Sequence, residues 1–126
     1  MDDSPTVCRL VETLLRKCGF DHIETVQDGF AALALLKFSP FDIIICDWEM
    51  QPVGGLEVLD RVRGNPDTKG IFFVLMSARK DPVWVLCAIE ASADCLLTKP
   101  FDAAILKRKI GQGFTAPREE ASVYAR

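Results

Sequence analysis

The sequence lacks the features that mark several large classes of protein. None of its apolar runs approaches the roughly 18 residues that a membrane-spanning helix needs, and the chain opens with acids where a signal peptide is basic and then apolar. Basic residues are too few for a nucleic-acid or anionic-membrane surface, since 15 Lys and Arg stand against 18 Asp and Glu, a formal net charge of -3. Neither a GxGxxG nor a P-loop lysine motif occurs, which argues against a nucleotide-binding domain.

Histidine and cysteine do not form the patterns of a metal cluster or of a disulfide framework. His22 is the single histidine, and the five cysteines include no CxxC pair. Most of these cysteines fall at apolar positions, so we expect reduced, buried thiols and a cytoplasmic protein. We expect His22 to be a partly exposed strand residue and not a phosphorylated one.

The 126 residues, 49% of them apolar and 26% charged, predict one domain with one core. Apolar periodicity and turn signals predict helices at 5–18, 30–38, 56–63, 82–91 and 102–111, and strands at 22–26, 43–46, 71–76 and 95–98. In the helix at 82–91 we expect Leu86 and Ile89 to face inward. The alternation predicts an α/β fold, a doubly wound parallel sheet with helices on both faces.

The start of the chain departs from this pattern, because only Met1 stands where a strand should precede the first helix. A missing central strand would leave unpaired N–H and C=O groups on its neighbours. Three explanations stay open: the natural protein starts earlier, a partner or swapped segment fills the gap, or the alternating residues at 121–125 return as a strand. We favour the first, because the alternating pattern is short and follows Pro117. We therefore assign 1–114 to the domain and 115–126 to a polar tail.

Polar side chains stand where several predicted strands end. Asp47 follows the apolar run at 43–46, Ser77 follows that at 71–76, and Lys99 follows that at 95–98, while Asp2 and Asp3 stand where the first strand would end. Right-handed crossovers bring the carboxyl ends of parallel strands to one edge of the sheet, where open α/β folds bind ligands. Three acids, a hydroxyl and a lysine at one edge suggest a divalent cation and a phosphoryl group.

Taken in order, these motifs resemble the receiver domain, the CheY-like (flavodoxin-like) phosphoacceptor module of two-component response regulators. The resemblance covers residues 2 to about 114 and rests on Asp2-Asp3-Ser4, Gln27-Asp28-Gly29, Asp47, Gly55-Leu56-Glu57, Ser77-Ala78 and Lys99-Pro100-Phe101. The chain departs from the family pattern at several positions. Glu49 replaces a small or amide residue, Ser92 replaces a common glycine, and Leu96 replaces the aromatic residue that many members carry.

The resemblance implies a role for each residue around the phosphoacceptor. Asp47 would be the nucleophile that forms an acyl phosphate, Ser77 would hydrogen-bond a phosphoryl oxygen, and Lys99 would pair first with Asp47 and then with the phosphoryl group. The alternatives are a loop-capping aspartate, a hydroxyl that satisfies a strand end, and a solvated lysine. Pro100 resembles the family's cis proline.

The resemblance also implies a Mg²⁺ site. Asp3 and Asp47 would bind the ion directly together with the backbone carbonyl of Glu49, and Asp2 would act largely through water. The alternative is that the two N-terminal acids cap the first helix and favour its positive end. The side chain of Glu49 either hangs over the pocket or is solvated at its rim.

The implied function is that of a single-domain response regulator in a two-component phosphorelay. Its partners would be a histidine kinase or histidine phosphotransferase and a downstream protein, bound through the face built from 82–91, 95–98 and 102–111, and a homodimer is possible. It would catalyse only its own phosphoryl transfer and dephosphorylation. The main alternative is a degenerate receiver that binds proteins without phosphorylation. A phosphohydrolase of the haloacid-dehalogenase type is disfavoured, because Glu49 stands where its second aspartate belongs and the chain lacks room for a substrate cap.

Overall fold

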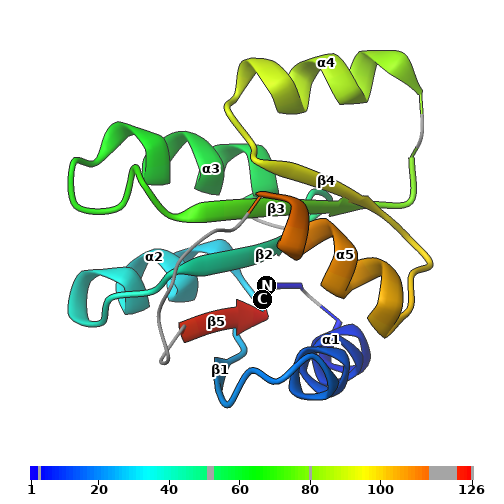
Figure 1. Ribbon diagram of the computed structural model, residues 1–126. Helices are drawn as coiled ribbons and strands as arrows, with labels where there is room; N and C mark the ends of the chain where they lie inside the picture. Colours follow the sequence, from blue (N-terminus) through cyan, green and yellow to red (C-terminus); the bar gives the residue numbers. More distant parts are fainter. Residues whose placement is uncertain (3, 51–52, 80, 114–121, 126) are drawn as a thin grey trace.

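The computed structural model describes residues 1–2, 4–50, 53–79, 81–113 and 122–125, and it confirms a parallel α/β fold (Figure 1). Within this part of the chain, helices and strands alternate in the order α1 (Pro5–Lys17), β1 (His22–Glu24), α2 (Gly29–Phe38), β2 (Ile43–Asp47), α3 (Gly55–Gly64), β3 (Phe72–Ser77), α4 (Pro82–Glu90), β4 (Cys95–Thr98), α5 (Ala103–Gly113) and β5 (Ser122–Ala125). Among the described residues, no helix is long and apolar enough to cross a bilayer.

Most of the helices begin at a residue whose side chain caps the helix. In four of them an oxygen of the N-cap residue accepts the backbone N–H three residues later, and these caps are Ser4, Asp28, Asp81 and Asp102. Each cap satisfies one of the backbone donors that a helix start leaves without a partner. Gly19, with φ of +99°, follows α1 in the left-handed conformation that glycine adopts without strain.

The sheet has the strand order β1-β5-β2-β3-β4, and neighbouring strands are parallel. Its two central strands, β2 and β3, are buried at every residue. Side chains alternate between two clusters: Ile44, Cys46, Phe73 and Leu75 pack toward α2, α3 and α4, and Ile43, Ile45, Val74 and Met76 pack toward α1 and α5. Both faces of the sheet are therefore covered, which explains why these strands are apolar without interruption.

The place of the first strand is filled by β5, which lies between β1 and β2 and pairs with both. Met1 extends this strand position: its ammonium donates to the carbonyl of Ile45 (2.6 Å), and its carbonyl accepts from the N–H of Asp47 (2.7 Å). Because Ala125 pairs with Ile45, Met1 occupies the next register position, and the two chain ends meet in Figure 1.

Residues 122–125 are thus a strand, and the assignment of all of 115–126 to a tail is wrong for this segment. The C-terminal segment returns to the sheet in the structure, although the sequence pattern favours an earlier natural start over this return. The physical reason is that β1 and β2 both present backbone groups that need a partner, and four residues in extended conformation suffice to pair with them.

The inward face of α4 differs from the sequence expectation. Leu86 and Ile89 are 58% and 65% exposed, so their predicted inward orientation is wrong. The helix instead turns Trp84, Cys87, Ala88 and Ala91 toward the sheet. Since α4 is apolar on nearly every side, periodicity could not identify which stripe of this spacing would be buried.

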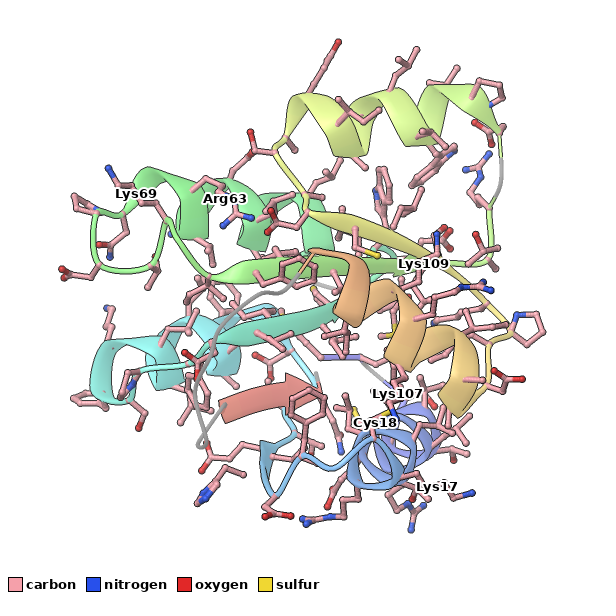
Figure 2. All side chains as sticks on the ribbon, in the orientation of Figure 1. Lys17, Cys18, Arg63, Lys69, Lys107 and Lys109 are labelled. Atoms are coloured by element: carbon pink, nitrogen blue, oxygen red, sulfur yellow. The ribbon has the colours of Figure 1, made fainter. Side chains whose placement is uncertain are left out.

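The five cysteines form no disulfide with one another; Cys8 and Cys46 are buried as expected, whereas Cys18, Cys87 and Cys95 are only partly buried. Burial raises the pKa of Cys18, although the nearby Lys107 opposes this in part (Figure 2). Burial is also the main cause of the raised pKa of Cys95. These two thiols therefore stay protonated at neutral pH.

Arg63, at the end of α3, fixes the turns beside β3 and β4 (Figure 2). Its guanidinium donates to the backbone carbonyls of Lys69, Ile71 and Ser92 and forms an ion pair of 2.7 Å with Asp94. The N–H of Ser92 and that of the next residue bond back to α4 carbonyls in the pattern of a Schellman motif, with φ of +68° at Ser92.

We predict that Ser92→Gly stabilises the protein. A non-glycine residue in the left-handed conformation costs roughly 1–2 kcal/mol, and glycine removes this cost. Glycine also has a larger conformational entropy in the unfolded chain, which offsets part of the gain. The expected net gain in the free energy of unfolding is about 0.5–1 kcal/mol, measured by urea denaturation. Ser39→Gly is the matched control, because Ser39 caps α2 in an extended conformation. A gain at Ser39 equal to that at Ser92 would contradict the argument.

We also predict that Val123→Pro destabilises the sheet, whereas Val123→Thr does so much less. Val123 pairs with Ile23 on one side and Ile43 on the other, so proline removes a ladder donor from an interior strand position. The expected loss is about 3 kcal/mol in urea denaturation. Equal, small losses for both variants would show that residues 122–125 are not an interior strand.

Candidate functional site

Four polar side chains meet at the carboxyl edge of the sheet. Asp47 ends β2, Ser77 ends β3, and Lys99 follows β4, so three adjacent parallel strands deliver them side by side. Asp2 joins them from the N-terminus, held in place by Met1 at the first-strand position. Asp2 and Ser77 are each 2% exposed and Asp47 is 6% exposed. The structure thus places Asp2, Asp47, Ser77 and Lys99 at one edge of the sheet, while Asp3, the fifth residue of the expected group, lies outside the described residues.

The Lys99 ammonium bridges two buried carboxylates. Its Nζ lies 2.8 Å from Oδ1 of Asp47 and 3.1 Å from Oδ2 of Asp2. The other oxygen of Asp2 accepts the backbone N–H of Ser4 at 2.9 Å, which fixes its orientation at the start of α1. Two carboxylates share one cation, so these three side chains together carry a net negative charge at neutral pH.

The pKa of Lys99 is raised above its ordinary value. Burial by itself lowers this pKa, but the hydrogen bonds and charges of Asp47 and then Asp2 outweigh the burial. A raised lysine pKa means that the interaction, as long as the two carboxylates are ionised, stabilises the fold below about pH 10.4 and is lost as pH rises through the folded-state pKa. Lys99 is therefore a fixed cation throughout the physiological range.

Backbone bonds align Lys99 and Ser77 with each other. The N–H of Lys99 donates to the Ser77 carbonyl at 2.8 Å, and the Lys99–Pro100 peptide bond is cis, as the resemblance implies. The Ser77 hydroxyl accepts the backbone N–H of Arg79 at 3.0 Å. Ser77 thus presents a buried hydroxyl proton at the same edge as Asp47.

The residues expected to hold Mg²⁺ are only partly described. Asp3 lies outside the described residues, while Asp2 and Asp47 are in place and the side chain of Glu49 is exposed. Within the part of the chain that the structure describes, no three His, Cys, Asp or Glu side chains are grouped closely enough to hold a metal ion. Two buried carboxylates with a net negative charge nevertheless fit a hard divalent cation, which prefers oxygen ligands.

The loop after Asp47 depends on Gly55. Its N–H donates to the carbonyl of Trp48 at 3.0 Å, and a Cβ at this position would clash with the backbone carbonyl of Asp47. Only glycine lets the start of α3 approach the end of β2 this closely. The glycine that the sequence motif includes therefore has a steric role at the site.

Two residues near this site escaped sequence reasoning. Trp84 in α4 packs edge-on against Trp48, with ring centroids 4.4 Å apart and planes at 65°. The guanidinium of Arg79 lies 4.3 Å from the centroid of the Trp84 ring. Only knowledge of the inward face of α4 could have identified Trp84 as the partner of Trp48.

Comparison with known proteins agrees with this geometry. A sequence model of the response regulator receiver domain matches residues 1–111. The chain is 32% identical over 114 residues to the chemotaxis protein CheY-3 of Vibrio cholerae, covering 90% of this chain and 88% of that protein. The solved structure of Vibrio cholerae CheY4 superposes with a TM-score of 0.83 at 27% identity, covering 90% and 93%. The Mn²⁺-bound form of the response regulator Rcp1 gives a TM-score of 0.75 at 27% identity, covering 97% and 96%.

We predict that Lys99→Met lowers the free energy of unfolding by about 1–3 kcal/mol at pH 7. The substitution leaves two buried carboxylates without their cation. Because Lys99 is partly exposed, the loss is smaller than for a fully buried ion pair. Urea denaturation measures the loss, and Lys107→Met on the exposed side of α5 is the matched control. The double variant Lys99→Met/Asp47→Asn should recover part of it. Additive effects of the two substitutions would contradict direct coupling.

Proposed function

Because the chain belongs to the response regulator receiver domains, we propose that it accepts a phosphoryl group on Asp47 in a two-component phosphorelay. The observation that carries this proposal is the contact of Lys99 with Asp47 at 2.8 Å, at the end of a buried strand and beside the Ser77 hydroxyl. A cation, a nucleophile and a hydroxyl donor are the groups that phosphoryl transfer needs.

The reaction follows from these three groups. A carboxylate oxygen of Asp47 attacks phosphorus in line, and the bond from phosphorus to the donor nitrogen of a phosphohistidine breaks, with its electron pair leaving on that nitrogen. The Lys99 ammonium, already at the carboxylate, moves its hydrogen bond to a phosphoryl oxygen. The Ser77 hydroxyl donates to a second phosphoryl oxygen. Both contacts offset charge that the added group brings to a buried site.

Asp2, Asp3, Asp47 and the backbone carbonyl of Glu49 are the groups proposed to hold Mg²⁺. When bound, the ion supplies positive charge to the phosphoryl oxygens. The net negative charge of the Asp2, Asp47 and Lys99 group supports this assignment. Rcp1, which has the same fold at 27% identity, has been solved with Mn²⁺ bound.

The proposed output is a protein contact on the face of α4, β4 and α5. Val83, Leu86 and Ile89 of α4 are exposed apolar side chains, which is typical of a surface that meets another protein. A histidine kinase or histidine phosphotransferase would supply the phosphoryl group in the cytoplasm, and a downstream protein or a second copy of the chain would read this face. No nucleic acid or membrane contact is proposed.

A degenerate receiver remains the second candidate, and Glu49 is the observation that favours it. Glu49 stands two residues after Asp47 and is exposed, so its negative charge opposes the approach of an anionic donor. Such a protein would use the same face for binding without phosphorylation.

We predict that acetyl phosphate with Mg²⁺ adds one phosphoryl group to the protein, and that Asp47→Asn abolishes the addition. Intact-protein mass spectrometry measures it. Asp60→Asn, an exposed aspartate on α3, is the matched control and should be phosphorylated as the wild type is. Omission of Mg²⁺ should slow the reaction strongly. A folded wild type that gains no mass would favour the degenerate receiver, and a gain that survives Asp47→Asn would show that another residue carries the phosphoryl group.

A further inference from the structure

The chain has two tryptophans, and they contact each other beside the phosphoacceptor. Trp48 follows Asp47 directly, is 7% exposed, and is tied to the sheet because its N–H donates to the carbonyl of Met76 at 2.9 Å. Trp84 lies in the first turn of α4 and packs on the same core cluster. One aromatic contact therefore joins the end of β2 to the start of α4.

Arg79 joins this aromatic pair to Ser77. Its backbone N–H donates to the Ser77 hydroxyl oxygen at 3.0 Å, while its guanidinium lies over the Trp84 ring at 4.3 Å. Its Nε also lies 3.5 Å from Oδ2 of Asp81, and Oδ1 of Asp81 caps α4 by accepting the N–H of Trp84. The residue that holds Ser77 therefore also holds the first turn of α4.

The rest of the inward face of α4 is small. Apart from Trp84, the residues that it turns to the core are Cys87, Ala88 and Ala91. Side chains of this size make little contact between the helix and the sheet. The orientation of α4 therefore depends chiefly on the position of the Trp84 ring. Leu96 of β4, which packs on the same cluster, carries no polar group that could hydrogen-bond to the site.

We propose that Arg79 and Trp84 are the positioning residues through which the state of Asp47 sets the position of α4. This proposal rests on the proposed function. When the Ser77 hydroxyl moves toward a phosphoryl oxygen, the hydrogen bond to Arg79 is stretched and the guanidinium shifts on the Trp84 ring. The ring then repacks against Trp48, and α4 changes the exposure of Val83, Leu86 and Ile89. Phosphorylation thereby shifts the population of two α4 positions.

The test measures hydrogen exchange of the α4 amides, residues 82–90, before and after phosphorylation with acetyl phosphate and Mg²⁺, with the fraction phosphorylated read by intact mass in each sample. We expect phosphorylation to change α4 exchange severalfold in the wild type. Arg79→Gln and Trp84→Leu should be phosphorylated to within about twofold of the wild type but lose most of the α4 response. Arg79→Lys, which keeps a cation over the ring, should retain it.

The controls separate the possible failures. Arg61→Gln removes an exposed arginine of α3 and should leave the α4 response unchanged. Arg79 is 53% exposed, so Arg79→Gln keeps the core intact and serves as the decisive variant if Trp84→Leu fails to fold. A normal α4 response in phosphorylated Arg79→Gln, or no α4 response in phosphorylated wild type, would overturn this proposal alone. A wild type that takes no phosphoryl group would overturn it together with the proposed function.

Discussion

One ammonium group between two buried carboxylates holds the functional edge of this protein together. Asp2 lies at the start of the chain and Asp47 at the end of β2. Lys99, which follows β4, contacts both carboxylates. Without this cation, two acids at one buried edge would repel each other and would be costly to keep ionised. The same arrangement aligns the Asp47 carboxylate, which we propose as the nucleophile, with the cation that would pass to the phosphoryl group. Stability and the proposed chemistry therefore depend on the same contact.

The parallel sheet places that contact. Its strands must all end on one edge, and every interior strand must have two partners, so the first-strand position cannot stay empty. In this structure β5 takes the position, and Met1 continues it toward Asp2. Asp2 lies beside Lys99 because Met1 pairs with β2 and the backbone N–H of Asp2 donates to the carbonyl of Val26.

The sequence predicts most of the architecture, because the signals there are local. The apolar runs that became β2 and β3 and the polar residues at strand ends each act through their immediate neighbours in the chain. The sequence therefore predicts that Asp47, Ser77 and Lys99 lie at one edge of the sheet, and the structure places them at adjacent strand ends.

What the sequence could not predict depends on packing between distant segments. Trp84 is packed against the core in place of Leu86 and Ile89 because of the shape of the surface against which α4 packs. The sequence of an almost wholly apolar helix does not indicate which of its faces is buried. The return of residues 122–125 was decided by the open backbone edges of β1 and β2. The contact of Arg79 with Trp84 depends on both the loop and the helix, so it too became visible only in three dimensions.

The central claim is that the carboxylate of Asp47, and no other group, carries the phosphoryl bond. An acyl phosphate is reduced by borohydride to the alcohol, which converts the modified aspartate to homoserine. Peptide mass spectrometry after reduction of the acetyl phosphate-treated protein should therefore find homoserine at position 47 and aspartate at positions 2, 42 and 60. Homoserine at another acidic position, or none in a folded protein, would contradict the account.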